Sequence, residues 1–512
     1  FLVDCGMEQG NDVYENQELP IAASDVDCIL LTHAHIDHSG LIPLMYVNGF
    51  RGQVYSTSAT AQLCEIMLRD SAHIQMFEAE WRNRKAARSG GKLKEFVPLY
   101  DMDAAVNVCK QFVGCEYDRV YDIAEGIKIR FTDVGHLLGS ASIEVWATEK
   151  TENGDVTEKI VFSGDIGNIN KPIIKDPKHV RDADYVVMES TYGNRSHGGT
   201  PNYVEDLTDI FKRTFERGGN VVIPSFAVGR TQELLYIIRK IKEDNLVGRD
   251  FDVYMDSPLA IEATNIFIKN VESCFDDDAV ELVRKGINPL SFPGLKYATT
   301  GDESKQINFD PNPKVIISSS GMCEAGRIRH HLKHNLWRPE CTIVFVGYQA
   351  VGTTGRIIVD GAEEIKLFGE PIQIKAEIVQ LKGSSGHADK DGLLCWINAF
   401  DTKPKKVFVV HGEDSVCDEF TECLKEEYGY DAMAPYTGGS YDLIADRVIS
   451  EGVKERKTRR TTSTQRGKTV FDRLVAAGKR LMTVITHNEG GTNKDLAKFT
   501  DQINALCDKW DR

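Results

Sequence analysis

The chain has 512 residues, a formal net charge of −16 and a charged-residue content of 27%. This length exceeds one ordinary hydrophobic core, so two or three domains are expected, and no apolar run approaches the roughly 20 residues that span a membrane. The negative charge argues against a nucleic-acid partner, because basic surfaces supply most non-specific binding to phosphates, although residues 454–480 carry ten Lys or Arg against two Asp or Glu, a local +8.

The first part of the chain predicts a series of strands. It opens on "FLVDCG", which is typical of a strand already under way and has no initiator Met, so we expect a short N-terminal piece, with any targeting segment, to precede it. The segments "VDCILLTHAH", "EGIKIRFTDVGH", "ASIEVWATE", "KIVFSGDIG" and "DADYVVMESTYG" are short, apolar or alternating, and predict strands. Their ends carry polar residues, at the position where α/β enzymes commonly place their chemistry.

After about residue 200 the pattern changes to alternating helices and strands. "YVEDLTDIFKRTFERGG" and "GRTQELLYIIRKIKE" predict amphipathic helices, while "NVVIPS", "DFDVYMDSP", "PKVIISSSG" and "CTIVFVGY" predict buried strands. This alternation favours a separate parallel-sheet domain over residues 194–370. "AEIVQLKGSSGHAD" and "PKKVFVVHGE" return to strands that end in a histidine, so we expect the second domain to be inserted into the first.

The tail predicts a helical hairpin behind a basic, Thr-rich linker. "KTVFDRLVAAGKRLMTVI" and "TNKDLAKFTDQINALCDKW" place apolar residues three and four apart, and Thr492 with Asp495 forms a capping box. The apolar stripes favour docking on the body or self-association. The linker from Lys454 either strengthens RNA binding through its charge or is a solvated connector.

Four side chains that can bind metal lie within six positions: His33, His35, Asp37 and His38. Imidazole and carboxylate groups are ligands of Zn²⁺. Four of them do not fit around one catalytic ion that also keeps a water molecule, whereas two ions about 3.5–4 Å apart accommodate them. His136 in "DVGHLLGSAS", Asp165 in "FSGDIGN" and His411 in "VVHGE" offer further ligands at predicted strand ends. An isolated His-x-His pair is ordinary, but this combination predicts a dinuclear site.

The motifs "THAHIDHSG", "GHLLGSAS" and "FSGDIGN" resemble the metallo-β-lactamase fold. "ESTYG", "SFAVGRTQELL", "MDSPLA", "SSSGMCEAGR", "SGHAD" and "VHGE" resemble its β-CASP branch of nucleic-acid hydrolases, to which RNase J belongs. The resemblance covers about residues 1–445. It implies an αββα sandwich over residues 1–193 and 371–450, an inserted parallel-sheet β-CASP domain over 194–370, and a C-terminal helical extension over 451–512.

Carried over by motif, the resemblance assigns His33, His35 and His136 to one zinc ion. It assigns Asp37, His38 and His411 to the other, with Asp165 as the bridge. Asp4 in "FLVDCG" orients a ligand from behind, and Glu189 and His387 match the acid and the histidine of the branch. RNA-directed members of the branch carry His at the last metal position, so His411 favours RNA over DNA.

The implied chemistry is attack of an activated water on phosphorus, with Asp37 in the catalytic site and His387 as the proton donor to the leaving oxygen. Glu189 would keep His387 protonated and oriented. In the inserted domain, the turn containing Ser320 would bind the substrate. Arg327 and Arg230 are either phosphate contacts or structural arginines paired with Asp or Glu. His330, His331 and His334 lie on a helical pattern and are expected to be surface or packing residues.

The sequence therefore predicts a zinc-dependent ribonuclease that cleaves single-stranded RNA, as an endonuclease or a 5′-3′ exonuclease, in RNA processing or decay. Twelve scattered cysteines without CxxC pairs favour a cytoplasmic protein, and the family habit favours a homodimer. A catalytically inactive scaffold and a small-molecule metallo-hydrolase of the same fold are the alternatives. The long insertion and His387 argue against the second of these, and the intact set of ligands argues against the first.

Overall fold

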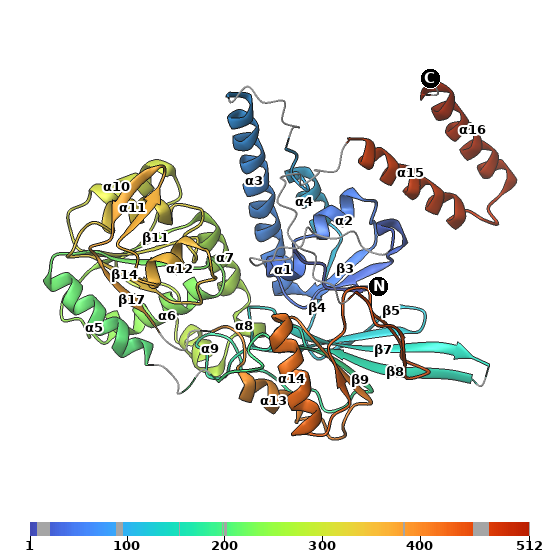
Figure 1. Cartoon of the computed structure of the whole chain (residues 1–512), viewed down its shortest axis with the longest axis horizontal. Coiled ribbons are helices and arrows are strands. Elements are labelled where there is room, and N and C mark those ends of the chain that lie inside the picture. The colour runs from blue at the N-terminus through green and yellow to red at the C-terminus, as the bar shows by residue number, and fades with distance from the viewer. Residues whose placement is uncertain are drawn as a thin grey trace.

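The computed structural model describes residues 1–7, 21–88, 96–152, 154–196, 198, 202–381, 385–453 and 470–510. Figure 1 shows two bodies side by side, with two C-terminal helices at one end of the molecule. Within the described ranges, no helix has the length and apolar character needed to cross a membrane. The basic linker predicted from Lys454 lies outside these ranges, so its role stays a prediction.

The first body contains a four-stranded parallel sheet at the N-terminal end of the chain, in the order β1-β2-β3-β4. Helices pack on the outer side of this sheet, because the apolar face of the sheet and the apolar stripes of the helices must be buried against each other. The strands are β1 (Leu2–Val3), β2 (Cys28–Leu30), β3 (Gln53–Thr57) and β4 (Phe112–Cys115), and the helices are η1 (Ala23–Asp25), α1 (Ile36–Ser39), α2 (Ile42–Val47), α3 (Ser58–Arg88) and α4 (Met102–Cys109).

A second, seven-stranded sheet faces the first, in the order β19-β18-β9-β8-β7-β6-β5. Buried Leu30, Ile129, Phe131 and Ile143 fill the space between the two sheets, while α13 and α14 cover the outer face. This arrangement confirms the predicted αββα sandwich. The elements are β5 (Val120–Ala124), β6 (Ile127–Asp133), β7 (Ala141–Thr151), β8 (Gly154–Phe162), β9 (Tyr185–Glu189), α13 (Lys390–Ile397), β18 (Lys406–Val410), α14 (Asp414–Glu426) and β19 (Ala432–Met433).

The second body, here called the cap, is built on a six-stranded parallel sheet in the order β12-β11-β13-β10-β14-β17. Helices α5 to α7 pack on one face and α10 to α12 on the other. The elements are α5 (Tyr203–Glu216), β10 (Val221–Pro224), α6 (Arg230–Glu243), β11 (Asp252–Asp256), α7 (Pro258–Lys269), α8 (Val271–Cys274), α9 (Asp277–Arg284), β12 (Leu295–Tyr297), α10 (Gly301–Phe309), β13 (Lys314–Ser318), α11 (Ile328–Asn335), β14 (Thr342–Phe345), α12 (Thr354–Val359), β15 (Glu364–Leu367), β16 (Glu370–Gln373) and β17 (Glu377–Gln380).

The cap is inserted into the first body, as predicted. β9 and β18 are parallel neighbours, with Glu189 opposite Val410, although the whole cap separates them in sequence. One expectation was wrong: the "AEIVQL" strand, β17, pairs with β14 in the cap sheet and not with the first body. A short apolar strand that is buried on both faces has the same sequence pattern in either sheet, so the pattern alone could not place it.

The predicted C-terminal hairpin is present as α15 (Val470–His487) and α16 (Asn493–Trp510), behind the small hairpin β20 (Ser440–Asp442) and β21 (Arg447–Ser450). The Thr492 hydroxyl accepts a hydrogen bond from the backbone N–H of Asp495, which caps α16. Helix α15 touches the first body through the Thr483 hydroxyl, 3.1 Å from the Asp25 carboxylate. Apolar residues of both helices, such as Met482 and Trp510, are exposed.

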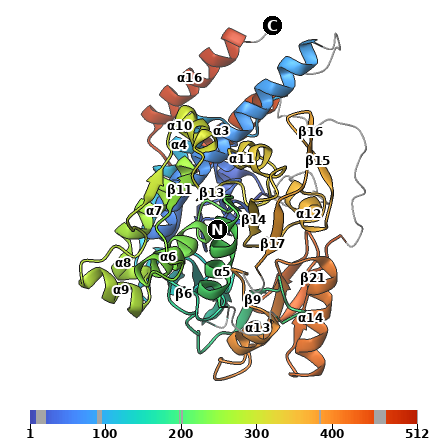
Figure 2. The same cartoon turned by 90° about the vertical axis from the view of Figure 1, so that its left-hand side faces the viewer.

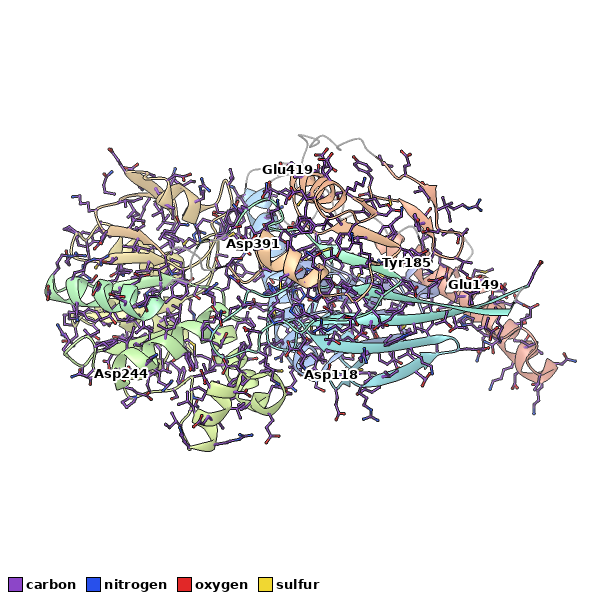
Figure 3. The ribbon with its side chains drawn as sticks, turned by 90° about the horizontal axis from the view of Figure 1, so that it is seen from below. Asp118, Glu149, Tyr185, Asp244, Asp391 and Glu419 are labelled. Atoms are coloured by element: carbon purple, nitrogen blue, oxygen red, sulfur yellow. The ribbon has the colours of Figure 1, made fainter. Side chains whose placement is uncertain are left out.

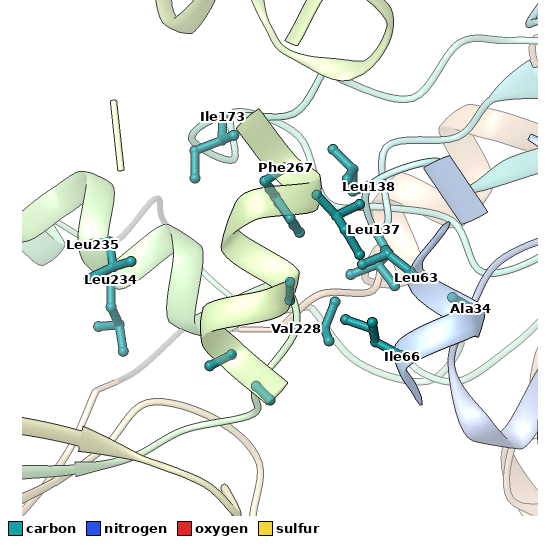
Figure 4. Close-up of a cluster of buried hydrophobic side chains, with 14 of the residues drawn as sticks. Ala34, Leu63, Ile66, Leu137, Leu138, Ile173, Val228, Leu234, Leu235 and Phe267 are labelled. Atoms are coloured by element: carbon teal, nitrogen blue, oxygen red, sulfur yellow. The ribbon is translucent and has the colours of Figure 1, made fainter. Parts of the chain in front are cut away.

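A buried hydrophobic cluster joins the two bodies. Figure 4 shows Leu63 and Ile66 of α3 and Leu137 of the first body lying opposite Val228 and Phe267 of the cap, all of which are buried. Seen from below in Figure 3, the cap, with Asp244, lies beside the first body, which contains Asp118, Glu149 and Tyr185. The cap is therefore held on the first body by a continuous apolar core, which fixes its position over the strand ends described next.

We expect Leu63→Ala to lower the free energy of unfolding by about 2–5 kcal/mol, because it leaves a cavity in this shared cluster. Leu63 is completely buried. The matched control is Leu474→Ala, since Leu474 is 66% exposed and its truncation should cost little. Urea unfolding of both variants measures the difference, and equal stabilities would contradict the proposed role of the cluster.

Candidate metal centre

The predicted metal-binding residues meet at one end of the two facing sheets. His33 and His35 follow β2, and Asp37 and His38 belong to the short helix α1 directly after them. The remaining members lie in loops at the ends of strands or before a helix: His136 after β6, Asp165 after β8, His387 before α13 and His411 after β18. Because neighbouring parallel strands end at the same sheet edge, residues far apart in sequence come together here.

The Asp165 carboxylate lies at the centre of this group and is 1% exposed. One of its oxygens lies 3.4 Å from His33 Nε2 and 3.6 Å from His136 Nε2. The other lies 3.2 Å from His38 Nε2 and 3.4 Å from His411 Nε2. The carboxylate thus faces two pairs of imidazoles, one on each oxygen.

The candidate ligand atoms gather in three groups. Atoms of His33, His35, His136 and Asp165 all lie within 4.8 Å of one another, as do those of Asp37, His38 and His411 and those of Asp165, Glu189 and His387. Asp165 Oδ1 and His38 Nε2 lie 3.2 Å apart, but their geometry makes no hydrogen bond, and among the described residues neither buried atom has another hydrogen-bond partner. Buried polar atoms without partners are costly, and nitrogen and oxygen donors in this arrangement suit divalent cations such as Zn²⁺. The residues therefore fit a metal centre.

Electrostatics separate the histidines into neutral and charged members. Burial, together with repulsion from neighbouring imidazoles, holds the pKa of His33 and His136 well below the usual value. Burial also lowers the pKa of His35, to about 4. These three imidazoles are therefore neutral near pH 7, the form in which a histidine binds a metal. Burial also opposes charge on His38, but Asp165 and Asp4 raise its pKa well above the usual value.

Asp4 supports the cluster from behind. Its carboxylate accepts a hydrogen bond of 2.6 Å from His38 Nδ1 and two of 2.8 Å from the backbone and hydroxyl of Thr32. His38 Nε2 is thereby turned toward Asp165. Gly6, two residues after Asp4, packs tightly against the Asp37 backbone, because a Cβ atom on Gly6 would stand 1.5 Å from the carbonyl oxygen of Asp37. Only glycine at position 6 allows this approach of "DCG" to the loop that carries Asp37.

Glu189 and His387 form a pair at the edge of the cluster. Glu189 is buried, and its carboxylate lies 3.1 Å from His387 Nδ1 while also accepting the backbone N–H of Ile166 at 2.5 Å. Burial works against charge on His387, yet Glu189 and Asp165 raise its pKa to about 9. Since His387 Nδ1 also lies 3.9 Å from Asp165, the pair places a protonated imidazole beside the metal-binding atoms.

A cavity of about 250 Å³ opens beside this group, lined by Asp4, Asp37, His38, Asp165, Glu189 and His411 together with Val3, Thr32, Phe162, Ser163, Gly164, Val187 and Val410. Its lining thus combines candidate metal ligands and other polar residues with apolar side chains. His411 is the most exposed of the histidines around Asp165, with 32% of its side chain accessible. The second set of ligands, which contains His411, therefore faces the opening.

The three residues predicted to bind substrate each contact other residues of the cap. Arg327 donates to Asp256 at 2.7 Å and to the carbonyl oxygens of Ala298 and Thr299. Arg230 pairs with Glu233 at 2.5 Å. Of the two alternatives for these arginines, the structure thus provides the ion pairs. The Ser320 hydroxyl lies 3.3 Å from the carbonyl oxygen of Ala325, within the same turn.

The histidines of helix α11 contact cap residues, as expected. His331 is fully buried and lies 2.6 Å from Asp256 and 2.9 Å from Asn308. His330 stacks on Phe368, with ring centroids 4.4 Å apart. His331 helps hold the carboxylate that binds Arg327, so the start of α11 is anchored to the cap sheet.

Sequence reasoning missed Lys171, which links the metal loop to the cap. Its ammonium group donates to the backbone carbonyl of His136 at 2.7 Å and lies 3.6 Å from Glu233 of α6. Lys171 is nearly buried, and nothing in "DIGNINK" distinguishes it from a surface lysine. Sequence reasoning also missed Thr32, although the position of Thr32 directly before His33 was a usable signal. Both residues position ligands without being ligands.

Three family models match the chain. A metallo-β-lactamase superfamily domain matches residues 1–168, a β-CASP domain matches residues 231–358, and a Zn-dependent metallo-hydrolase RNA specificity domain matches residues 371–435. The first and last matches flank the second, in agreement with the inserted topology of the sheets.

Curated relatives cover most of the chain. Ribonuclease TTHA0252 of Thermus thermophilus is 34% identical over 81% of this chain and 88% of its own length. The transcription termination factor FttA of Methanosarcina mazei is 32% identical over 85% of this chain, but the match spans only 66% of that relative. An RNase J-like protein of Methanocaldococcus jannaschii is 31% identical, over 80% of this chain and 86% of its own length.

We expect Asp4→Asn to weaken metal binding by about 10–100-fold, because a neutral amide no longer fixes the charge and orientation of His38. Asp4 has a positive φ of 59°, and Asn tolerates this backbone conformation, so the change tests the charge and not the turn. Competition with a chelator of known affinity measures the effect. Asp122→Asn, at an exposed ion pair with Lys128, is the control, and equal metal retention in both variants would contradict this role of Asp4.

Proposed function

The chain belongs to the β-CASP branch of the metallo-β-lactamase superfamily, and we propose that it is a zinc-dependent ribonuclease that hydrolyses phosphodiester bonds in single-stranded RNA. As a member of this family it is a metal-dependent hydrolase. The observation that carries the proposal is the buried Asp165 carboxylate, which is surrounded by histidines although one of its oxygens makes no hydrogen bond. The RNA specificity domain over residues 371–435 supports RNA as the substrate.

We assign the ligands in two groups around a pair of Zn²⁺ ions. His33, His35 and His136 would hold one ion, and Asp37, His38 and His411 the other, with Asp165 shared between them. The mutual distances within each group support this division. Two ions also account for the two orphaned buried atoms, Asp165 Oδ1 and His38 Nε2. When bound, such ions lower the pKa of a water molecule toward neutrality and offset negative charge on a phosphate oxygen.

The protein side chains would complete the reaction. His387 would give its proton to the leaving 3′-oxygen, so that the products carry a 3′-hydroxyl and a 5′-phosphate. Glu189 would hold His387 in its protonated form and orient it, in keeping with their 3.1 Å separation. Asp37 would act on the same side of the site as His411, at the cavity opening.

In the cap, we retain Ser320 as a proposed substrate contact and assign Arg327 and Arg230 a positioning role. Arg327 is bound to Asp256, and Arg230 is bound to Glu233. Moving either guanidinium group to a phosphate would break its ion pair, and in the case of Asp256 the carboxylate that loses its arginine is fully buried.

We further propose a cytoplasmic location and a homodimer. The cysteines are all unpaired, which is typical of a reducing compartment. The exposed apolar residues of α15 and α16 provide a surface that a second copy could cover.

The intact set of candidate ligands disfavours an inactive scaffold, and the cap disfavours a small-molecule hydrolase, because a small substrate needs no second domain over the site.

The test incubates the purified full chain with 5′-labelled RNA, 3′-labelled RNA and matched DNA, and measures bound metal in parallel. We expect two ions per chain and cleavage of RNA in preference to DNA. Asp165→Ala should lose metal and activity together. His387→Ala should keep its metal and lose about 10²–10⁴-fold in rate, because only the proton donor is removed.

His334→Ala is the matched control, since His334 is an exposed histidine of the cap. Its activity should equal that of the wild type. Full activity of Asp165→Ala would refute the metal mechanism, and fewer than two ions at saturating metal would refute the dinuclear assignment. A preference for DNA would refute the proposed substrate. The ladder of products separates internal cutting from shortening at the 5′ end.

A further inference from the structure

The outer half of α3 carries exposed aromatic residues that no function described so far uses. Ile74, Phe77 and Trp81 are 49%, 58% and 52% exposed. They are spaced three and four residues apart, so they lie on one face of the helix. Figures 1 and 2 show this end of α3 projecting beyond the rest of the first body.

This face continues the one that binds the cap. Ala59, Leu63 and Ile66 of the inner half are buried, and Figure 4 shows Leu63 and Ile66 directed toward Val228 of the cap. The same three-and-four spacing leads from Ile66 through Asp70 to Ile74, Phe77 and Trp81. A single stripe of α3 therefore starts inside the joint between the two bodies and emerges on the surface on the side of the cap.

Beyond Trp81 the stripe becomes basic. Residues 81–88, "WRNRKAAR", contain four Arg or Lys and no acidic residue, in a chain of net charge −16. Arg84 and Arg88 extend the three-and-four spacing of the stripe, and both are exposed. Lys85 Nζ lies 5.0 Å from the centre of the Trp81 ring. Of the two acidic residues just before Trp81, Glu78 is paired with Arg82, and Glu80 is exposed.

We propose that this outer stripe of α3, formed by Phe77, Trp81, Arg84, Lys85 and Arg88, is a second binding surface for single-stranded RNA, outside the metal centre. Bases stack on the two aromatic rings, and the basic residues bind the phosphates that follow. Phe77 and Trp81 are one helical turn apart, a rise of about 6 Å, so each ring receives a base of its own. This surface provides further contacts for an RNA substrate that leaves the metal centre between the two bodies. In this respect the inference rests on the proposed function.

Charge complementarity favours RNA over a protein partner. Exposed aromatic rings next to clustered cations are the usual elements of a surface that binds single strands without sequence preference. Lysine is depleted in protein interfaces relative to the rest of the surface, whereas Lys85 Nζ lies 5.0 Å from the centre of the Trp81 ring. The chain as a whole carries a net charge of −16, so attraction for a polyanion has to come from local basic surfaces such as this one.

The test measures binding of fluorescent, unstructured RNA oligonucleotides of increasing length by anisotropy. The full chain carries His387→Ala, which blocks cleavage. Phe77→Ala with Trp81→Ala should weaken binding of long RNA at least about tenfold, because each lost stack contributes substantially, while short RNA binds as before. Arg84→Gln with Arg88→Gln should reduce the salt dependence of log Kd by roughly 0.7 per cation removed.

The control is Phe309→Ala with Trp337→Ala, a pair of cap aromatics that are 71% and 54% exposed. Both pairs of substitutions lie at exposed positions, and alanine is compatible with the α3 helix, so thermal unfolding should be unchanged. Wild-type affinity of the Phe77/Trp81 variant for every RNA length overturns the proposal. The proposal is also overturned if the Phe77/Trp81 variant keeps its RNA affinity but changes its oligomeric state in sedimentation. That result would assign the stripe to contact with a second copy of the chain. If the wild type binds long RNA through α3 but cleaves nothing, the proposed function fails and this inference stands.

Discussion

The Asp165 carboxylate is almost completely removed from water, and burial alone would drive it to take up a proton. Attraction from His38, His411 and His387 instead holds its pKa well below the usual value. The free-energy penalty for removing this charge from water is thus offset by attraction to groups from three separate parts of the chain. Each histidine must reach Asp165 from its own strand end or loop, which fixes the relative positions of these ends. The precise register of the second sheet and the site therefore depend on one another.

The inserted cap follows from the same constraint. His387 and His411 both lie after the cap in sequence, so the site is complete only when the chain has folded the cap and returned to pair β18 with β9. Leu137, next to the candidate ligand His136, is packed in the cluster shared with the cap. Lys171 binds the carbonyl oxygen of His136 and lies beside Glu233. A displacement of the cap would thus be transmitted to a candidate ligand through two contacts, one apolar and one charged.

Much of this arrangement was predictable from sequence because it is encoded locally. Strand periodicity located β2, β6, β8 and β9, and the polar residues at their ends identified the atoms that meet at the site. The sequence could not show which of several chemically equivalent ion-pair partners or neighbouring strands a residue or strand would contact. Arg327 finds Asp256, 71 residues away, and β17 joins the cap sheet. Both outcomes are decided by distant packing. Lys171 was missed for the same reason, since only its burial between two bodies separates it from other lysines.

The charge of the chain imposes a last condition on any nucleic-acid substrate. With a net charge of −16, and with Asp4, Asp37, Asp165 and Glu189 all lining the cavity, the protein without bound cations would repel a phosphodiester from the place where it must react. Bound divalent ions would reverse the sign of the local field, so metal binding and substrate binding would be coupled energetically. Protonated His387 adds positive charge at the same point. A single strand held there still needs attraction along its length, and in this chain such attraction has to come from local groups of basic residues, because the average surface cannot provide it.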